Sequence, residues 1–245
     1  PQFLGLSSLV TVGIEWMSEC RMLRSPKFLG LSSLEYVGDK WMSWCRMLYS
    51  PQFNGLTSLV NVGDLWMGGC DALQTPVFKG LENLDSVGNL WMFQCPMLLD
   101  PRFLGLSSLN KVGSHWMGWC PRLLDPQFQG LSSLNNVGDL WMSNCNALQS
   151  PKFIGLENLL TIGHSWMSIC GMLQSPVFNG LENLNTIGKE WMYGCPRLLF
   201  LETLFAGLSS LENVGRYHIE KGDDISLLPI WSRNPHERWM YELSE

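Results

Sequence analysis

The chain has 245 residues, of which 46% are hydrophobic, and a net charge of −6. This is enough apolar material for a continuous core, and the excess of acids argues against nucleic acid as the main partner. No apolar run approaches the ~20 residues that a membrane-spanning helix needs.

A 25-residue unit that starts at Pro1 is written eight times, and no copy gains or loses a residue between positions 1 and 200. The unit reads P-x-F-x-G-L-x-x-L-x-x-[VI]-G-x-x-W-M-x-x-C-x-x-L-x-[STDF]. Constant spacing over so many copies is typical of a solenoid, whose repeats pack on their neighbours. We therefore expect one elongated domain of eight repeats over residues 1–200, whose ends stack on further repeats or on another subunit.

The first expected element is a short strand around each proline, as in residues 23–28. Apolar residues stand at the first, fourth and sixth places of this segment, which is the spacing of a leucine-rich repeat. Stacked copies would form a parallel sheet. Because proline cannot donate to a sheet ladder, we expect it at the first residue of the strand, with two to four residues paired.

The second expected element is a short helical turn that follows Gly13. Val12, Trp16, Cys20 and Leu23 are spaced by four, four and three residues, which is one face of a short helix. This pattern predicts strands on one side of each coil and helical turns on the other.

The run V-G-x-x-W-M-x-x-C-x-x-L-x-S resembles the I-G-x-x-A-F-x-x-C-x-x-L-x-S core of the Treponema-type, BspA-like leucine-rich repeats. The resemblance covers all eight copies. Here the repeat is two residues longer than the family's usual unit, and Trp-Met replaces Ala-Phe. The resemblance implies a right-handed, curved α/β solenoid with short parallel strands on the concave face and short helical turns on the convex face. It implies use in binding, often on cell surfaces, and no catalytic residues.

One cysteine and one tryptophan recur at fixed places in every repeat. If the cysteines lie on a helical side, neighbouring segments are about 8–10 Å apart. Disulfides need Cα atoms within about 7 Å, so we expect free, buried thiols. Free thiols and the absence of an N-x-S/T sequon favour a reducing intracellular compartment over the cell surface. The strict period of the tryptophans predicts that they pack in the core rather than bind ligands.

After residue 200 the period falters. Residues 201–215 predict an irregular ninth repeat, displaced by two residues, and residues 216–245 predict a C-terminal cap. A partner-docking element is the alternative for this last segment. No catalytic, phosphate-binding or metal-binding signature occurs, so we expect no enzyme activity, no cofactor and no metal site.

Three variable places flank the proline, and alternation along a strand would turn them outward. They hold five basic residues and no acidic one. The candidate partner-binding residues are Arg24, Lys27, Tyr49, Lys79, Arg102 and Lys152. Trp44 and Trp119, which occur at one variable place in two repeats, are further candidates for exposed contacts. Alternatively, the five charges arose by chance on a solvated face.

We therefore expect a non-catalytic protein-binding scaffold that uses the concave sheet face, alone or as a subunit of a larger assembly. The expected partner is another protein with acidic character. The alternative is a cell-surface adhesin or ligand receptor of the BspA-like kind.

Overall fold

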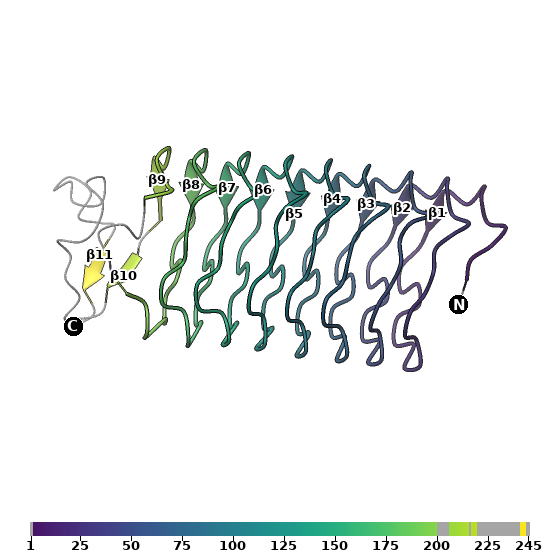
Figure 1. The fold of residues 1–245 in the computed structure, drawn as a ribbon, viewed down its shortest axis with the longest axis horizontal. Helices are drawn as coiled ribbons and strands as arrows, with labels where there is room; N and C mark the ends of the chain where they lie inside the picture. Colours follow the sequence, from purple (N-terminus) through teal and green to yellow (C-terminus); the bar gives the residue numbers. More distant parts are fainter. Residues whose placement is uncertain (1, 200–205, 216, 220–240, 244–245) are drawn as a thin grey trace.

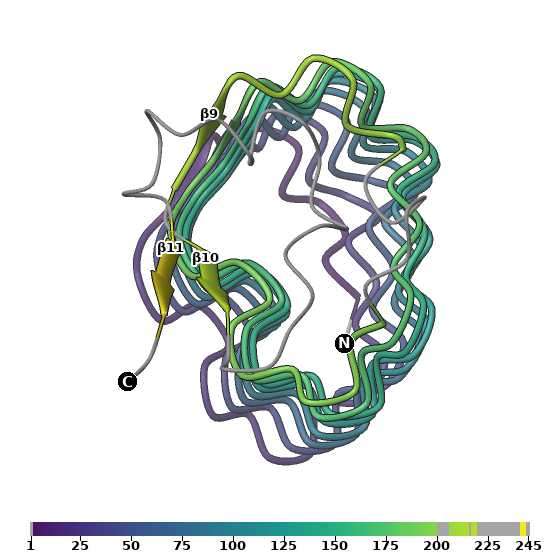
Figure 2. The same ribbon diagram turned by 90° about the vertical axis from the view of Figure 1, so that its left-hand side faces the viewer.

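The chain folds into a parallel β-solenoid. The computed structural model describes residues 2–199, 206–215, 217–219 and 241–243. The coils stand side by side along the long axis, with the two chain ends at opposite ends of the stack (Figure 1). Seen along the stack, successive coils overlie one another on a common ring-like outline (Figure 2).

Nine two-residue strands form one parallel sheet in the order β1 to β9. They are β1 (Thr11–Val12), β2 (Tyr36–Val37), β3 (Asn61–Val62), β4 (Ser86–Val87), β5 (Lys111–Val112), β6 (Asn136–Val137), β7 (Thr161–Ile162), β8 (Thr186–Ile187) and β9 (Asn213–Val214). From β1 to β8 each residue pairs with the residue 25 positions later, as Thr11 does with Tyr36. The last pair, Thr186 with Asn213, is separated by 213 − 186 = 27 positions.

The end of the chain contributes a separate pair of strands. β10 (Tyr217–Ile219) and β11 (Tyr241–Leu243) pair in parallel with each other. The rest of the predicted cap, residues 216, 220–240 and 244–245, lies outside the described residues. The cap over residues 216–245, and its docking alternative, stay predictions.

The expected strand around each proline is reduced to isolated bridges, such as Gln2 with Lys27 and Arg102 with Gln127. The Gln52 N–H donates to the Pro26 carbonyl at 2.9 Å. Proline itself has no N–H to return such a bond, which keeps the ladder short. The longer ladder lies instead just before the second glycine of the unit, where two consecutive residues pair.

The predicted helical turns are wrong: no helix occurs in the described residues. Alternate residues in this stretch have left-handed backbone, with φ of 63° at Glu15, 57° at Met17 and 54° at Glu19. An α-helix needs every residue in the right-handed region. The backbone groups bond to the next coil instead, since the Glu15 N–H donates to Asp39 at 2.7 Å and the Glu19 N–H to Ser43 at 2.8 Å.

The tryptophan ladder explains why the coils stack closely here. Trp41 and Trp66 lie face to face, with ring centroids 5.1 Å apart and planes 3° from parallel. Phe53 meets Trp66 edge-on at 5.5 Å. This stacking fits coils spaced like β-strands, about 4.8 Å apart. Packed helices lie about 8–10 Å apart, which would separate the indoles. The stacked tryptophans thus favour closely spaced coils.

The core runs through the centre of every complete coil. In the fifth repeat the inward side chains have no exposed surface; they are Phe103, Leu106, Leu109, Val112, Trp116, Met117, Cys120 and Leu123. The prediction that the periodic tryptophans and cysteines are core residues is confirmed, because those from the second to the seventh repeat are buried.

The eight cysteines are free, but the reason given from the sequence is wrong. Coils on this side have β-strand spacing, so distance alone does not keep the sulfurs apart. Each thiol from Cys45 onward instead donates to a methionine carbonyl of the preceding coil, as Cys45 Sγ does to Met17 at 3.0 Å and Cys145 Sγ to Met117 at 3.2 Å. Burial raises the pKa of Cys45 to about 11 and that of Cys145 to about 12.

Candidate functional site

The candidate surface lies along the proline segments. Side chains alternate there: Leu23, Pro26 and Phe28 are buried, whereas Arg24 and Leu29 are exposed. We call the outward residues of this segment the bridge face. Its three rows are Arg24, Tyr49, Gln74, Leu99, Leu124, Gln149, Gln174 and Leu199; Gln2, Lys27, Gln52, Val77, Arg102, Gln127, Lys152 and Val177; and Leu4, Leu29, Asn54, Lys79, Leu104, Gln129, Ile154 and Asn179.

The bridge face is not the nine-stranded sheet. The sheet β1–β9 is formed by the eleventh and twelfth places of each unit, whereas the bridge face comes from places 24, 2 and 4. The expectation that the candidate residues lie on the principal sheet is therefore corrected. Their outward alternation holds, because the single bridges still keep the segment extended.

The five candidate cations are open to solvent and to a partner. Arg24, Lys79, Arg102 and Lys152 are exposed, and Lys27 is half-buried. Within the described part of the chain, the ion pairs are Lys40 with Glu15 at 2.6 Å and Arg46 with Asp71 at 3.9 Å. Neither pair lies on the bridge face. Its cations thus have no carboxylate partner among the described residues.

Exposed apolar side chains accompany these cations. Leu104 is 51% exposed, Ile154 is 52% exposed and Tyr49 is 53% exposed. Other large apolar residues of the same rows are also exposed: Leu4, Leu29, Val77, Leu124, Val177 and Leu199. Exposed apolar side chains that gather on one face among polar ones are typical of protein-interaction surfaces.

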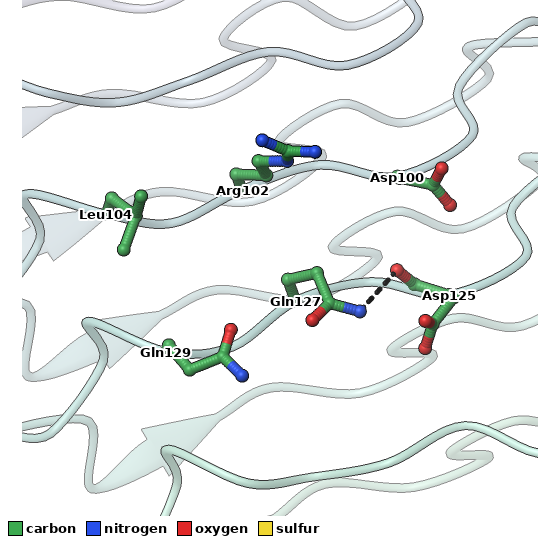
Figure 3. A pocket seen from close by; sticks show the side chains of 6 residues that line it. All are labelled: Asp100, Arg102, Leu104, Asp125, Gln127 and Gln129. Atoms are coloured by element: carbon green, nitrogen blue, oxygen red, sulfur yellow. Dashed lines mark hydrogen bonds between the residues drawn. The ribbon is translucent and has the colours of Figure 1, made fainter.

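Two acidic residues on this side were missed by the sequence reasoning. Asp100 and Asp125 occupy the last place of the unit and, with Arg102, help line a hollow of about 380 Å³. Figure 3 shows the hollow between two neighbouring segments, with the Gln127 side chain donating to the Asp125 carbonyl at 3.2 Å. Asp100 Oδ1 is buried without a hydrogen-bond partner among the described residues. The middle of the bridge face is therefore mixed in charge.

The aspartates that directly follow the second glycine of the unit help to join neighbouring coils. Asp39 Oδ1 accepts the N–H of Asp64 at 2.9 Å, and Asp139 Oδ1 accepts that of His164 at 2.7 Å. Each carboxylate bonds the backbone of the next coil. The separation of acids from the bridge-face cations thus follows in part from how the coils are joined.

Trp44 and Trp119 do not belong to the bridge face. They line a separate groove of about 350 Å³, which shares no residue with the hollow around Arg102. We call it the tryptophan groove; its lining residues are Trp44, Asp71, Gln94, Pro96, Trp119, Pro121, Asn144 and Asn146. The predicted site residues therefore fall into two groups.

The described residues hold neither a metal-binding cluster nor a membrane-spanning helix. Among the described residues, no group of three or more His, Cys, Asp or Glu side chains is arranged to hold a metal ion. The described part of the chain also has no helix of the length and apolarity needed to cross a membrane.

Comparisons with known proteins give weak matches to repeat proteins. A leucine-rich repeat protein from Bacteroides ovatus is 14% identical over 97% of this chain and 88% of that one, with a TM-score of 0.32. A leucine rich cell surface protein from Faecalibacterium prausnitzii is 13% identical over 89% and 84%, with a TM-score of 0.37. The pneumococcal vaccine antigen PcpA is 12% identical over 82% and 63%, with a TM-score of 0.31.

No model of a known protein family matches the chain, and no curated protein matches it. The three solved structures are similar to it only at TM-scores below 0.5. Functional proposals therefore rest on the residues of this chain.

Proposed function

We propose that the chain is a non-catalytic scaffold that binds another protein through the bridge face. The observation that carries this proposal is that exposed apolar side chains lie on the same face as five cations, and these cations have no carboxylate partner among the described residues. The core of the fold needs neither group, since the inward side chains of each coil already fill it.

The two kinds of side chain have different tasks at such an interface. Apolar groups such as Leu104 and Ile154 supply burial, which is the main source of affinity. Unpaired cations such as Arg102 and Lys152 attract carboxylates on the partner and fix its register. Asp100 and Asp125 add a place for a complementary cation near the centre.

A charge-reversal experiment tests the proposal. The double variant Arg102→Glu/Lys152→Glu changes two exposed side chains of the bridge face. Immobilised wild-type chain and variant are compared for the polypeptides that each retains from an extract of the source cells. We expect the variant to lose the wild type's specific partner, with affinity about tenfold or more lower.

The matched control is Lys111→Glu/Lys189→Glu, which makes the same charge change at two exposed lysines away from the bridge face. It should retain the partner as the wild type does. Equal loss in both variants would show a general charge effect, and equal retention in both would exclude the bridge face as the site.

The alternative role is that of a cell-surface adhesin or receptor, which requires the protein to lie on the outside of the cell. Staining of intact and permeabilised source cells with antibodies against the chain tests it, because only a surface protein is labelled on intact cells.

A further inference from the structure

We propose that the tryptophan groove binds an extended, uncharged carbohydrate chain. Trp44 is 43% exposed and Trp119 is 51% exposed, and both line the same groove. They occupy the same place of the unit three coils apart, so their backbones are about 14 Å from each other at the usual strand spacing. This groove is separate from the bridge face and does not depend on its function.

Both indoles stand on a fixed backbone. The backbone N–H of Trp44 donates to the Gly68 carbonyl at 2.7 Å, and the backbone N–H of Trp119 donates to the Ser143 carbonyl at 2.8 Å. The Trp44 ring lies against Gly69, where a Cβ would come within 2.2 Å of the ring. The ring is thus supported on its inner side, and its exposed part faces solvent as a preformed platform.

The backbone at this place is left-handed in all eight repeats. Trp44 has a φ of 56° and Trp119 a φ of 57°, in the left-handed region that bulky residues rarely adopt. Gly69 and Asn144 fill the same place in neighbouring coils and suit this conformation better. Glu19 and Ile169 have the same left-handed backbone at this place, so the conformation belongs to the coil, and the two tryptophans differ from the other residues there by their large exposed rings.

The rest of the lining fits sugar hydroxyls. Gln94 and Asn144 carry side-chain amides, each able both to donate and to accept hydrogen bonds. Asp71 adds carboxylate acceptors and is partly neutralised by the exposed Arg46 at 3.9 Å. A flat apolar ring with a polar edge, as in tryptophan, suits the apolar face of a pyranose flanked by hydroxyls.

Other ligands fit less well. A peptide cannot extend the backbone ladder here, because the N–H groups of Trp44, Gln94 and Trp119 already donate to the next coil. A single-stranded nucleic acid would also stack on aromatic rings, but it needs a cationic groove. The residues that line the groove include no Lys or Arg, and the chain has a net charge of −6, so phosphate binding is disfavoured.

Affinity electrophoresis of the 245-residue chain tests the proposal. Native gels contain hydroxyethyl cellulose, mannan or laminarin as neutral glycan probes, and polygalacturonate as an anionic probe. We expect at least one neutral glycan to retard the wild type. Trp44→Ala and Trp119→Ala should each weaken the apparent affinity about tenfold, and the double variant should abolish retardation.

Tyr36→Ala is the matched control, because Tyr36 is a 44% exposed aromatic residue of β2 outside the groove. It should leave retardation unchanged, as should the bridge-face variant Arg102→Glu/Lys152→Glu. Equal melting temperatures would show that the tryptophan variants fold. The proposal is overturned if no neutral glycan retards the chain, if only polygalacturonate does, or if the double variant is still retarded.

Discussion

At the scale of single residues, the repeated tryptophan decides how the chain packs. Trp91 and Trp116 stack with centroids 5.3 Å apart and planes 3° from parallel. Their indole N–H groups are buried with no acceptor among the described residues, which costs about 1–3 kcal/mol each. Burial of the large ring and its contacts with two neighbours must offset this cost. At the level of single residues, the stacked tryptophans therefore favour close spacing of the coils.

The buried thiols predict a dependence of stability on alkaline pH. Burial raises the pKa of Cys145 from 9.0 to about 12, so the folded chain holds this proton more tightly than the unfolded chain. The protonated thiol contributes fully to the stability of the fold below pH 9, and this contribution is lost as the pH rises towards 12. Each pKa unit corresponds to about 1.4 kcal/mol, so deprotonation of this thiol lowers the free energy of unfolding by on the order of 4 kcal/mol. Burial also raises the pKa of Cys70 and Cys120.

Urea unfolding at several pH values between 7 and 11 checks this prediction, with Cys145→Ala as the comparison. The variant loses a small amount of stability at neutral pH, and its stability should fall less steeply above pH 9. Parallel curves for the two proteins would contradict the assignment.

At the scale of the structural element, each coil depends on close backbone approach at its first glycine. A Cβ at Gly55 would lie 1.9 Å from the Phe28 carbonyl oxygen and 2.6 Å from the Leu29 Cα. Both are backbone atoms, which cannot move without opening the stack. The glycine of the G-L step is therefore needed for contact between coils.

We expect Gly55→Ala to destabilise the second and third coils by about 1–3 kcal/mol, as overpacking usually does. Amide hydrogen exchange followed by mass spectrometry should show faster exchange there than in the sixth and seventh coils. Ser58→Ala, at a half-buried place of the same coil, serves as a control that should change little. Unaltered exchange in Gly55→Ala would contradict the close approach.

The elements also show what a sequence can and cannot reveal. The alternation of buried Leu23, Pro26 and Phe28 with exposed Arg24 could be predicted, because it depends only on an extended backbone. The spacing of Val12, Trp16 and Cys20 predicted a helix, but alternating left-handed residues produce the same inward pattern. Such residues are rarely expected away from glycine, so periodicity alone could not distinguish the two.

The candidate sites were predictable to a similar extent. Variability between repeats identified Arg102 and Trp119 as outward residues. It did not reveal Asp100 and Asp125, which occupy a place that reads as a turn. Nor could it separate the tryptophan groove from the bridge face, because that separation depends on the path of the backbone between the nineteenth and twenty-fourth places.

At the scale of the whole molecule, identical coils at strand spacing create long, regular rows on the outside. Rows of this kind suit extended ligands, because each coil repeats the same geometry. The bridge face and the tryptophan groove lie on different rows of one scaffold, so the two proposals can be tested independently. The right-handed coiling and the curvature implied by the family resemblance stay predictions.

The far-ultraviolet circular dichroism spectrum of the purified chain tests the central claim most directly. Coils that stack at strand spacing on all sides, with no helix in the described residues, predict a spectrum without the helical double minimum. A helical signal equal to about one turn in each of the eight repeats would contradict the account. The coils would then be too far apart for the stacked tryptophans, and the tryptophan groove as described would not exist.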